Sequence, residues 1–338
     1  MRTNSRNIWI GFIGAGIVLS LLLWFVGIEK IKTTFARLTL QSLILICGLA
    51  LAWMLSWSLA LHRILNAVGT ETSLWSAFLL FASSAFADNI TPFGQAGGGP
   101  FTALLISKRT ETAYETGLAS ITSFDALNLI PSITLAAIGL SYYAVRYTVG
   151  RHIILILAVT GGAIMGLPII GYTSWHYSAK ISNQLTDFFM LILQYGSKVI
   201  PSYHPPSRKV ISKRVDGYFR AIKRIGTNPR DLITALVFAT AGWVLMSLIM
   251  YVSVQTLMKS PEVPLFIVLI IVPLATIASV TPLPGGTGGV EIAITLLLLP
   301  MGISEEVALG AALIYRFGTY WFSTVLGGMC VFALELTK

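Results

Sequence analysis

Four ionisable side chains interrupt otherwise apolar stretches of this 338-residue chain: Asp88, Asp125, Glu291 and Arg316. A charge at the centre of a membrane helix costs about 2.5–3.5 kcal/mol on insertion scales, so each needs a partner or a wet cavity. A guanidinium can hold a phosphate through two parallel hydrogen bonds, which makes Arg316 the first candidate for binding an anion. The alternative is that Arg316 pairs with Asp125 or Glu291 and only joins helices.

Three other candidates near these charges also have a structural alternative. Glu291 lies where the first turn of a short helix is expected, and a carboxylate there complements the helix dipole. Asp88 and Asn89 could bind a ligand, or could simply cap or turn the chain. Tyr320 is a candidate lining residue of the same site, although aromatic residues in such a place more often pack or lie at the interface.

Two segments rich in glycine and proline could bind an anion through their backbone. Glycine lets N–H groups converge on a ligand, and a helix that begins there adds the positive end of its dipole. The alternative is that these glycines only allow helices to pack closely. The candidate residues are Pro92, Gly94, Gly97, Gly98 and Gly99 in the first segment and Pro284, Gly285, Gly286 and Gly288 in the second.

The apolar pieces beside these segments predict two re-entrant helical hairpins. Residues 74–87 are apolar but shorter than the roughly 20 residues that cross a bilayer. They run into the break at 88–100, and residues 101–107 lead out. The second copy has the same order, with an apolar piece at 264–280 and a break at 281–289. Such breaks are tolerated at membrane depth only where protein or a wet cavity covers them.

The two broken segments align without gaps, which predicts an internal repeat. Thr91-Pro92 matches Thr281-Pro282, and Gly98-Gly99 matches Gly288-Gly289. We define residues 74–146 as the first repeat and residues 264–335 as the second. Each ends in a long apolar helix that carries one charge. The expected full spans are residues 8–28, 38–61, 114–145, 152–175, 232–258 and 307–334.

Composition excludes a soluble fold. Hydrophobic residues make up 55% of the chain and charged residues only 11%, against about 25% charged in soluble domains. We therefore predict an all-α polytopic membrane protein, in which residues 1–338 form one membrane domain. It should contain about six full transmembrane helices plus two re-entrant hairpins.

The basic residues predict the orientation. Of 23 Lys and Arg residues, 16 map to one side if residues 177–230 form a basic cytoplasmic loop, with an amphipathic helix around 210–225. The positive-inside rule then places this loop and the N-terminus in the cytoplasm. The first hairpin enters from the cytoplasm and the second from outside, so the repeats are inverted, as in transporter folds. The net charge of +9 therefore gives no reason to expect nucleic acid.

Motifs for catalysis or cofactor binding are missing. Cys47, Cys330 and the four His residues show no metal-ligand spacing, and no nucleotide-binding or hydrolase signature occurs. We expect no cofactor, no metal and no nucleic-acid partner. A homo-oligomer is left open.

The motifs resemble one known family. Residues 282–291 (PLPGGTGGVE) and 311–320 (AALIYRFGTY) resemble the C-terminal signature of the lysylphosphatidylglycerol synthase transmembrane region family, a family of flippase-like membrane domains. Residues 91–100 (TPFGQAGGGP) are similar to its N-terminal signature. By motif position the resemblance implies a role for Gly285, Gly286, Gly288, Glu291 and Arg316 in the second repeat and for Pro92, Gly94 and Asp125 in the first.

The resemblance implies a multi-pass protein of the cell (inner) membrane that moves an anionic or polyprenyl-phosphate-linked lipid between leaflets. Val290 and Thr122 depart from the family, because many members have Arg there. Synthase members also carry a soluble aminoacyl-transferase domain, which is absent from this sequence, so we expect no lysyl-transfer activity and no enzyme. The alternatives are a subunit of a membrane-embedded lipid-modifying transferase and a secondary transporter of small solutes or ions.

Overall fold

The computed structural model describes residues 36–146, 178–199, 206–258 and 264–336, together with the single residues 29, 32 and 166. All regular structure in these ranges is helical, which confirms the all-α prediction. The predicted spans 8–28 and 152–175, apart from residue 166, and the N-terminus lie outside the described residues.

The described helices follow one another with short connections. They are α3 (Leu40–Val68), α4 (Leu74–Ile90), α5 (Gln95–Thr110), α6 (Tyr114–Arg146), α8 (Ser178–Val199), α9 (Arg208–Gly226), α10 (Pro229–Leu257), α11 (Leu265–Ile277), η1 (Pro284–Gly286), α12 (Gly289–Leu298), η2 (Leu299–Met301), α13 (Glu305–Arg316), η3 (Phe317–Phe322) and α14 (Ser323–Leu336).

Five segments of the described chain are long and apolar enough to cross a membrane: Leu40–Val68, Tyr114–Tyr143, Pro229–Leu257, Pro284–Met301 and Glu305–Leu334. The fourth is not one continuous α-helix. Its α-helical part, α12, has ten residues, and at 1.5 Å per residue it spans only about 15 Å. The chain is thus a multi-pass membrane protein that also contains shorter apolar helices.

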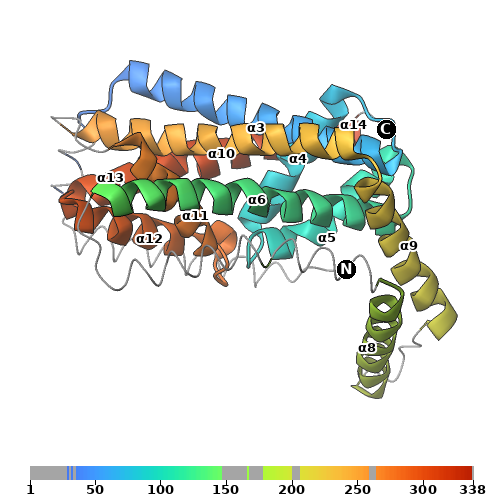
Figure 1. Ribbon diagram of the computed structural model, residues 1–338. Helices are drawn as coiled ribbons and strands as arrows, with labels where there is room; N and C mark the ends of the chain where they lie inside the picture. The colour runs from blue at the N-terminus through green and yellow to red at the C-terminus, as the bar shows by residue number, and fades with distance from the viewer. Residues whose placement is uncertain are drawn as a thin grey trace.

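The long helices run side by side along the bundle, and the two broken segments occupy opposite ends (Figure 1). Helices α4 and α5 gather towards the end where α9 leaves the bundle, whereas α11 and α12 lie towards the other end. Thr70, before α4, and Thr112, after α5, line the same cavity, so both ends of the first hairpin lie together.

The centre of the bundle is the contact between α3 and α10. The indole of Trp57 lies directly against Gly242, where a Cβ atom would overlap it. Its Nε1–H donates to the carbonyl of Ala239 at 3.1 Å, so the buried indole is hydrogen-bonded. α3 begins at an N-cap, Thr39, whose Oγ1 accepts from Ser42 N–H at 3.2 Å, and ends at Gly69, which adopts φ 92°.

The first helix of each hairpin packs on the long helix of the other repeat. α4 contacts α14, and α11 contacts α6. Glycine permits both approaches: a Cβ on Gly327 of α14 would overlap the Ala82 carbonyl, and a Cβ on Gly139 of α6 would meet the Phe266 carbonyl at 2.5 Å. The two repeats are therefore interlocked rather than stacked as separate halves.

The first break is shorter than the predicted one. Residues 88–100 were expected to be non-helical, but α4 continues to Ile90 and α5 begins at Gln95. Gly97, Gly98 and Pro100 therefore lie inside α5. Weak helix propensity is overridden here because glycine lets α5 lie against the end of α4, where a Cβ on Gly98 would overlap Asp88.

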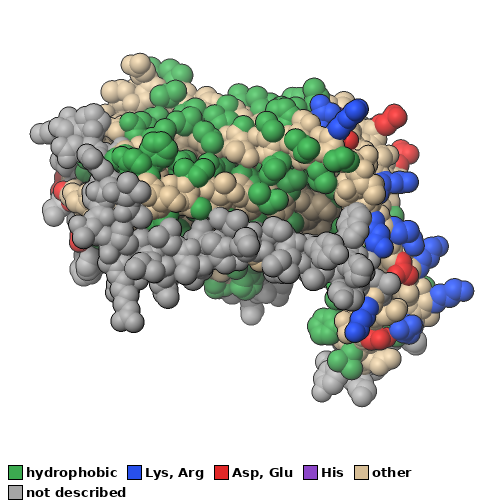
Figure 2. All heavy atoms as spheres, viewed as in Figure 1, with side chains coloured by type: hydrophobic (Ala, Val, Ile, Leu, Met, Phe, Trp, Pro, Cys, Tyr) green, Lys and Arg blue, Asp and Glu red, His purple; other side chains and the backbone are tan. Residues whose placement is uncertain are grey.

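The predicted basic loop at 177–230 is also more ordered than expected. It contains α8, which the sequence analysis treated as loop, and α9, which covers the predicted amphipathic helix. Lys and Arg side chains gather at this end of the molecule and along α9, whereas hydrophobic side chains cover the flank of the bundle in this view (Figure 2).

Candidate functional site

The two breaks meet inside the bundle and are hydrogen-bonded to each other's repeat. The N–H of Phe93, in the first break, donates to the carbonyl of Thr281, in the second, at 3.1 Å. The hydroxyl of Tyr320 donates to the carbonyl of Asn89 at 3.2 Å. The Asn89 amide returns a bond to Thr324 Oγ1 at 2.9 Å. The repeats thus join where their backbones are irregular.

Arg316 and Glu291 form a buried ion pair beside this junction. Arg316 is 7% exposed and Glu291 is 2% exposed. Arg316 Nε donates to Glu291 Oε1 at 3.0 Å. The other carboxylate oxygen, Oε2, accepts from the Gly288 N–H at 2.7 Å, which caps the start of α12. Of the two partners that the sequence left open for Arg316, the structure provides Glu291.

The Arg316 guanidinium is fixed on further sides. Nη2 donates to the carbonyl of Gly285 at 2.9 Å and lies 3.5 Å from Thr287 Oγ1. The ring of Tyr320 stacks on the guanidinium, with 4.1 Å from Cζ to the ring centroid, as in a cation–π contact. Among the described residues, Nη1 has no hydrogen-bond partner. Arg316 is therefore held in place with one donor group unused.

A π-helical segment, η3, begins directly after Arg316. Such segments are rare, and they are frequent at functional sites. Here the segment carries Tyr320, whose ring covers the guanidinium. The sequence analysis predicted a regular long helix at 307–334 and missed this segment. No residue pattern used there distinguishes a π-helical turn from an α-helical one.

A small cavity of about 130 Å³ opens between the two breaks. Because a water molecule takes about 30 Å³ of liquid, this cavity has room for roughly four waters. Its charged lining residues are Asp88, Asp125 and Arg316. The remaining lining residues are Trp53, Trp57, Phe81, Ser84, Ala85, Asn89, Gly94, Phe124, Met246, Thr276, Ser279, Gly285, Thr319 and Ser323. The sequence analysis missed the aromatic and hydroxyl residues of this lining, which resemble ordinary helix residues.

The carboxylates of the cavity are not balanced by a free cation. Arg316 is already paired with Glu291. Asp88 and Asp125 have no hydrogen-bond or ion-pair partner within the described ranges. The cavity therefore offers one donor group, Arg316 Nη1, beside two uncompensated carboxylates.

The hydrogen bonds of the glycine segments favour close packing over anion binding by the backbone. The N–H groups of Gly97 and Gly98 both donate to the Gly94 carbonyl at 3.0 Å. In the second segment, the Gly286 N–H donates to the Leu283 carbonyl at 3.1 Å. Gly285 has φ 56°, and a Cβ there would overlap the Tyr320 ring.

The remaining predicted site residues lie at the edges of this junction. Pro92 is half-buried in the first break, and Pro284 is buried at the start of η1. Gly99, in α5, has no atom within 4 Å of its Cβ position. None of these three lines the central cavity.

This arrangement agrees with the comparison to known families. Residues 8–327 match the model of the lysylphosphatidylglycerol synthase TM region. The chain belongs to this family. The lysylphosphatidylglycerol synthase TM region family thus accounts for nearly the whole sequence, including both breaks and Arg316.

Two archaeal relatives extend over the same length. A UPF0104 membrane protein of Pyrococcus horikoshii is 23% identical over 329 residues, which cover 94% of each chain. A UPF0104 membrane protein of Methanothermobacter thermautotrophicus is 25% identical over 338 residues, covering 97% of this chain and 93% of that one. Their printed names state a membrane protein and no activity. The family thus supports the membrane fold, and the function must be argued from the cavity.

Proposed function

We propose that this protein moves a lipid with an anionic, phosphate-bearing headgroup between membrane leaflets, and that the headgroup passes through the central cavity. The observation that carries the proposal is the state of Arg316. Its guanidinium is buried and fixed by Glu291 and the Gly285 carbonyl, yet Nη1 has no partner among the described residues. A donor that is already oriented binds an anion with little further loss of side-chain entropy.

The size of the cavity supports a headgroup rather than a whole lipid. A space of about 130 Å³ accommodates a phosphate group but no acyl or prenyl chain. The outer surface beside the first break is apolar: Phe93 is 51% exposed, Phe101 39% and Leu104 41%. The tails would therefore stay against this surface in the bilayer while the headgroup crosses.

The placement of the hairpins suggests how the cavity could open to either side. α4 is 17 residues long and α11 is 13 residues long, or about 25 and 20 Å, and both are shorter than a hydrocarbon core of about 30 Å. We propose that each hairpin re-enters from its own side, with the α9 end cytoplasmic. Movement of one interlocked repeat against the other would then expose the cavity to alternate leaflets.

The uncompensated carboxylates predict that a positive charge accompanies the headgroup. A phosphate beside two ionised carboxylates would face repulsion at short range. Protons on Asp88 and Asp125, or a cation between them, would remove that repulsion. We therefore include a proton or a cation in the proposed cycle.

Reconstitution tests the proposal against its rivals. The intact protein is placed in phosphatidylcholine vesicles that contain fluorescent phosphatidylglycerol, and the fluorescence accessible to an impermeant quencher is followed. The proposal predicts faster exchange between leaflets than in protein-free vesicles, with the lipid chemically unchanged by mass spectrometry. A modified lipid would support the transferase alternative. Exchange equal to that of protein-free vesicles, for both phosphatidylglycerol and a prenyl phosphate, would contradict lipid transport.

A further inference from the structure

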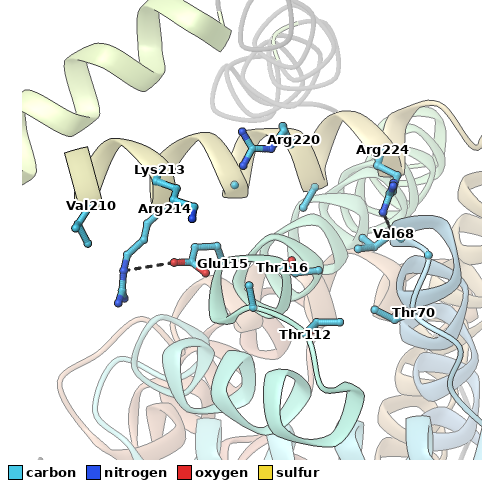
Figure 3. Close-up of a pocket in the computed structure, with 14 residues that line it drawn as sticks. Val68, Thr70, Thr112, Glu115, Thr116, Val210, Lys213, Arg214, Arg220 and Arg224 are labelled. Carbon is cyan, nitrogen blue, oxygen red and sulfur yellow. Dashed lines mark hydrogen bonds and ion pairs between the residues drawn. The ribbon is translucent and has the colours of Figure 1, made fainter. Parts of the chain in front are cut away.

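A second and larger cavity lies at the basic end of the bundle, beneath α9. Its volume is about 950 Å³. Helix α9 forms one wall, and the end of α3 and the α5–α6 turn form the other (Figure 3). It is lined by Val68, Gly69, Thr70, Thr112, Ala113, Glu115, Thr116, Val210, Lys213, Arg214, Gly217, Arg220, Ala221 and Arg224. It shares no lining residue with the central cavity.

Four basic side chains and one acid line this cavity. Arg214 reaches towards Glu115, with 3.6 Å between Nε and Oε1, and Arg224 donates to the Val68 carbonyl at 3.1 Å (Figure 3). Lys213 and Arg220 have no hydrogen-bond or ion-pair partner within the described part of the chain. The cavity therefore holds an excess of positive charge that the described residues do not neutralise.

An apolar groove of about 510 Å³ adjoins the basic cavity, with Glu115 and Arg214 lining both. It lies between α6, α8 and α9. Its other lining residues are Tyr114, Leu118, Leu185, Phe189, Ile192, Leu193, Ile211, Val215 and Tyr218. A basic cavity that continues into an apolar groove matches a molecule with an anionic head and a hydrocarbon chain.

From this continuity we propose that the α9 end binds an acidic phospholipid of the adjacent leaflet. Its phosphate lies between Lys213 and Arg220, and one acyl chain lies in the groove between α8 and α9. The shared chemistry of head and chain distinguishes this ligand from free phosphate, which has no use for the groove. The inference is independent of transport through the central cavity.

Gly217 keeps space in the basic cavity. It lies in the middle of α9, where glycine weakens a helix. A Cβ there would meet Glu115 Cβ at 3.7 Å and Arg220 Nη2 at 3.9 Å, which are ordinary contact distances. A small side chain would therefore fit, whereas a leucine would extend into the space proposed for the headgroup. Gly217→Leu thus blocks the site without changing its charge.

Ligand binding by the full-length protein in neutral detergent tests the inference. The probe is dodecyl phosphate, and the readout is the thermal unfolding midpoint followed by tryptophan fluorescence. An Arg316→Gln background removes the contribution of the proposed transport site. We expect a saturable rise in the midpoint with dodecyl phosphate. Inorganic phosphate and dodecyltrimethylammonium should produce no rise. An equal response to inorganic phosphate would contradict the amphiphile.

Two variants of equal charge change locate the site. Lys213→Gln with Arg220→Gln should weaken dodecyl phosphate binding at least tenfold, and Gly217→Leu should do the same. Lys209→Gln with Lys223→Gln changes two exposed basic residues of the same helix that do not line the cavity, and should leave binding within twofold. Equal weakening by both double variants would show a general charge effect and overturn the proposed site.

Native mass spectrometry provides a second readout that does not depend on the Arg316 background. Protein with wild-type Arg316, released from mixed phosphatidylcholine and phosphatidylglycerol, should retain phosphatidylglycerol. The Lys213→Gln, Arg220→Gln variant should retain less than the Lys209→Gln, Lys223→Gln variant. Equal retention would contradict the inference, whatever the result of the transport assay.

Discussion

Glu291 holds Arg316 and the start of α12 at the same time. One carboxylate oxygen accepts from Arg316 Nε at 3.0 Å, and the other accepts from the Gly288 N–H at 2.7 Å. The pair therefore fixes the second break to the helix that carries η3. A buried ion pair is weak evidence for net stability, because both charges lose their hydration. Its effect here is to orient the guanidinium at the cavity.

This pairing predicts strong coupling between the two residues. Glu291→Gln leaves Arg316 buried without its counter-ion, which costs about 3–5 kcal/mol in comparable sites. Adding Arg316→Gln should recover a large part of the loss, since no charge then stays buried. Thermal unfolding in detergent of the two single variants and the double variant measures this coupling. Additive losses in the double variant would mean that the ion pair does not determine this geometry.

Adjacent glycines of α5 provide a matched test of the first hairpin. Gly98→Ala places a Cβ on Asp88, so the contact between α4 and α5 must shift. Gly99→Ala meets no atom within 4 Å and should stabilise the helix by about 0.5–1 kcal/mol. The unfolding midpoint should therefore fall for Gly98→Ala and hold or rise for Gly99→Ala. The same fall in both would show that helix flexibility, rather than packing, requires these glycines.

Transport of an anionic lipid should depend on pH through Asp88 and Asp125. Protonation removes their repulsion of a phosphate, so the wild-type rate should rise as pH falls. The Asp88→Asn, Asp125→Asn variant mimics the protonated pair, and its rate should vary less with pH and exceed the wild-type rate at high pH. Exchange of a zwitterionic lipid in the same vesicles is the control. An unchanged pH dependence in the double variant would exclude these carboxylates as its source.

The re-entrant topology predicts which residues share a side of the membrane. Glu71, before α4, and Glu111, after α5, are exposed, and Glu305 is exposed at the start of α13. Single cysteines at these positions, with Cys47 and Cys330 replaced by alanine, can be labelled by an impermeant maleimide in sealed vesicles. Positions 71 and 111 should label from one side and position 305 from the other. Labelling of 71 and 111 from opposite sides would show that the α4–α5 segment crosses the membrane.

Sequence patterns predicted the elements of this fold better than their local geometry. The apolar lengths located α4 and α11, because hydrophobic runs are read directly from the chain. The extent of the first break was wrong, since close contact with Asp88 keeps Gly98 helical despite its poor propensity. α8 was missed because its polar positions were taken for a loop.

The central cavity was predicted only in part. Arg316 and Asp125 were found because a charge in an apolar run is costly. The choice of Glu291 as the partner of Arg316 depends on how the breaks fold, and spacing alone left Asp125 equally possible. The aromatic and hydroxyl lining, including Trp53 and Thr319, could not be recognised, since the same residue types occur throughout membrane helices.

The rate at which the Arg316→Gln, Glu291→Gln variant moves phosphatidylglycerol tests the central claim most directly. This pair of substitutions removes the cavity donor without leaving a buried charge. Arg63→Gln with Asp231→Asn is the matched control, because it removes an ion pair at 3.6 Å outside the cavity. With folding verified by unfolding midpoint, we predict at least a tenfold loss of exchange for the first variant and a rate close to wild type for the second. Wild-type exchange by the Arg316→Gln, Glu291→Gln variant would contradict the account.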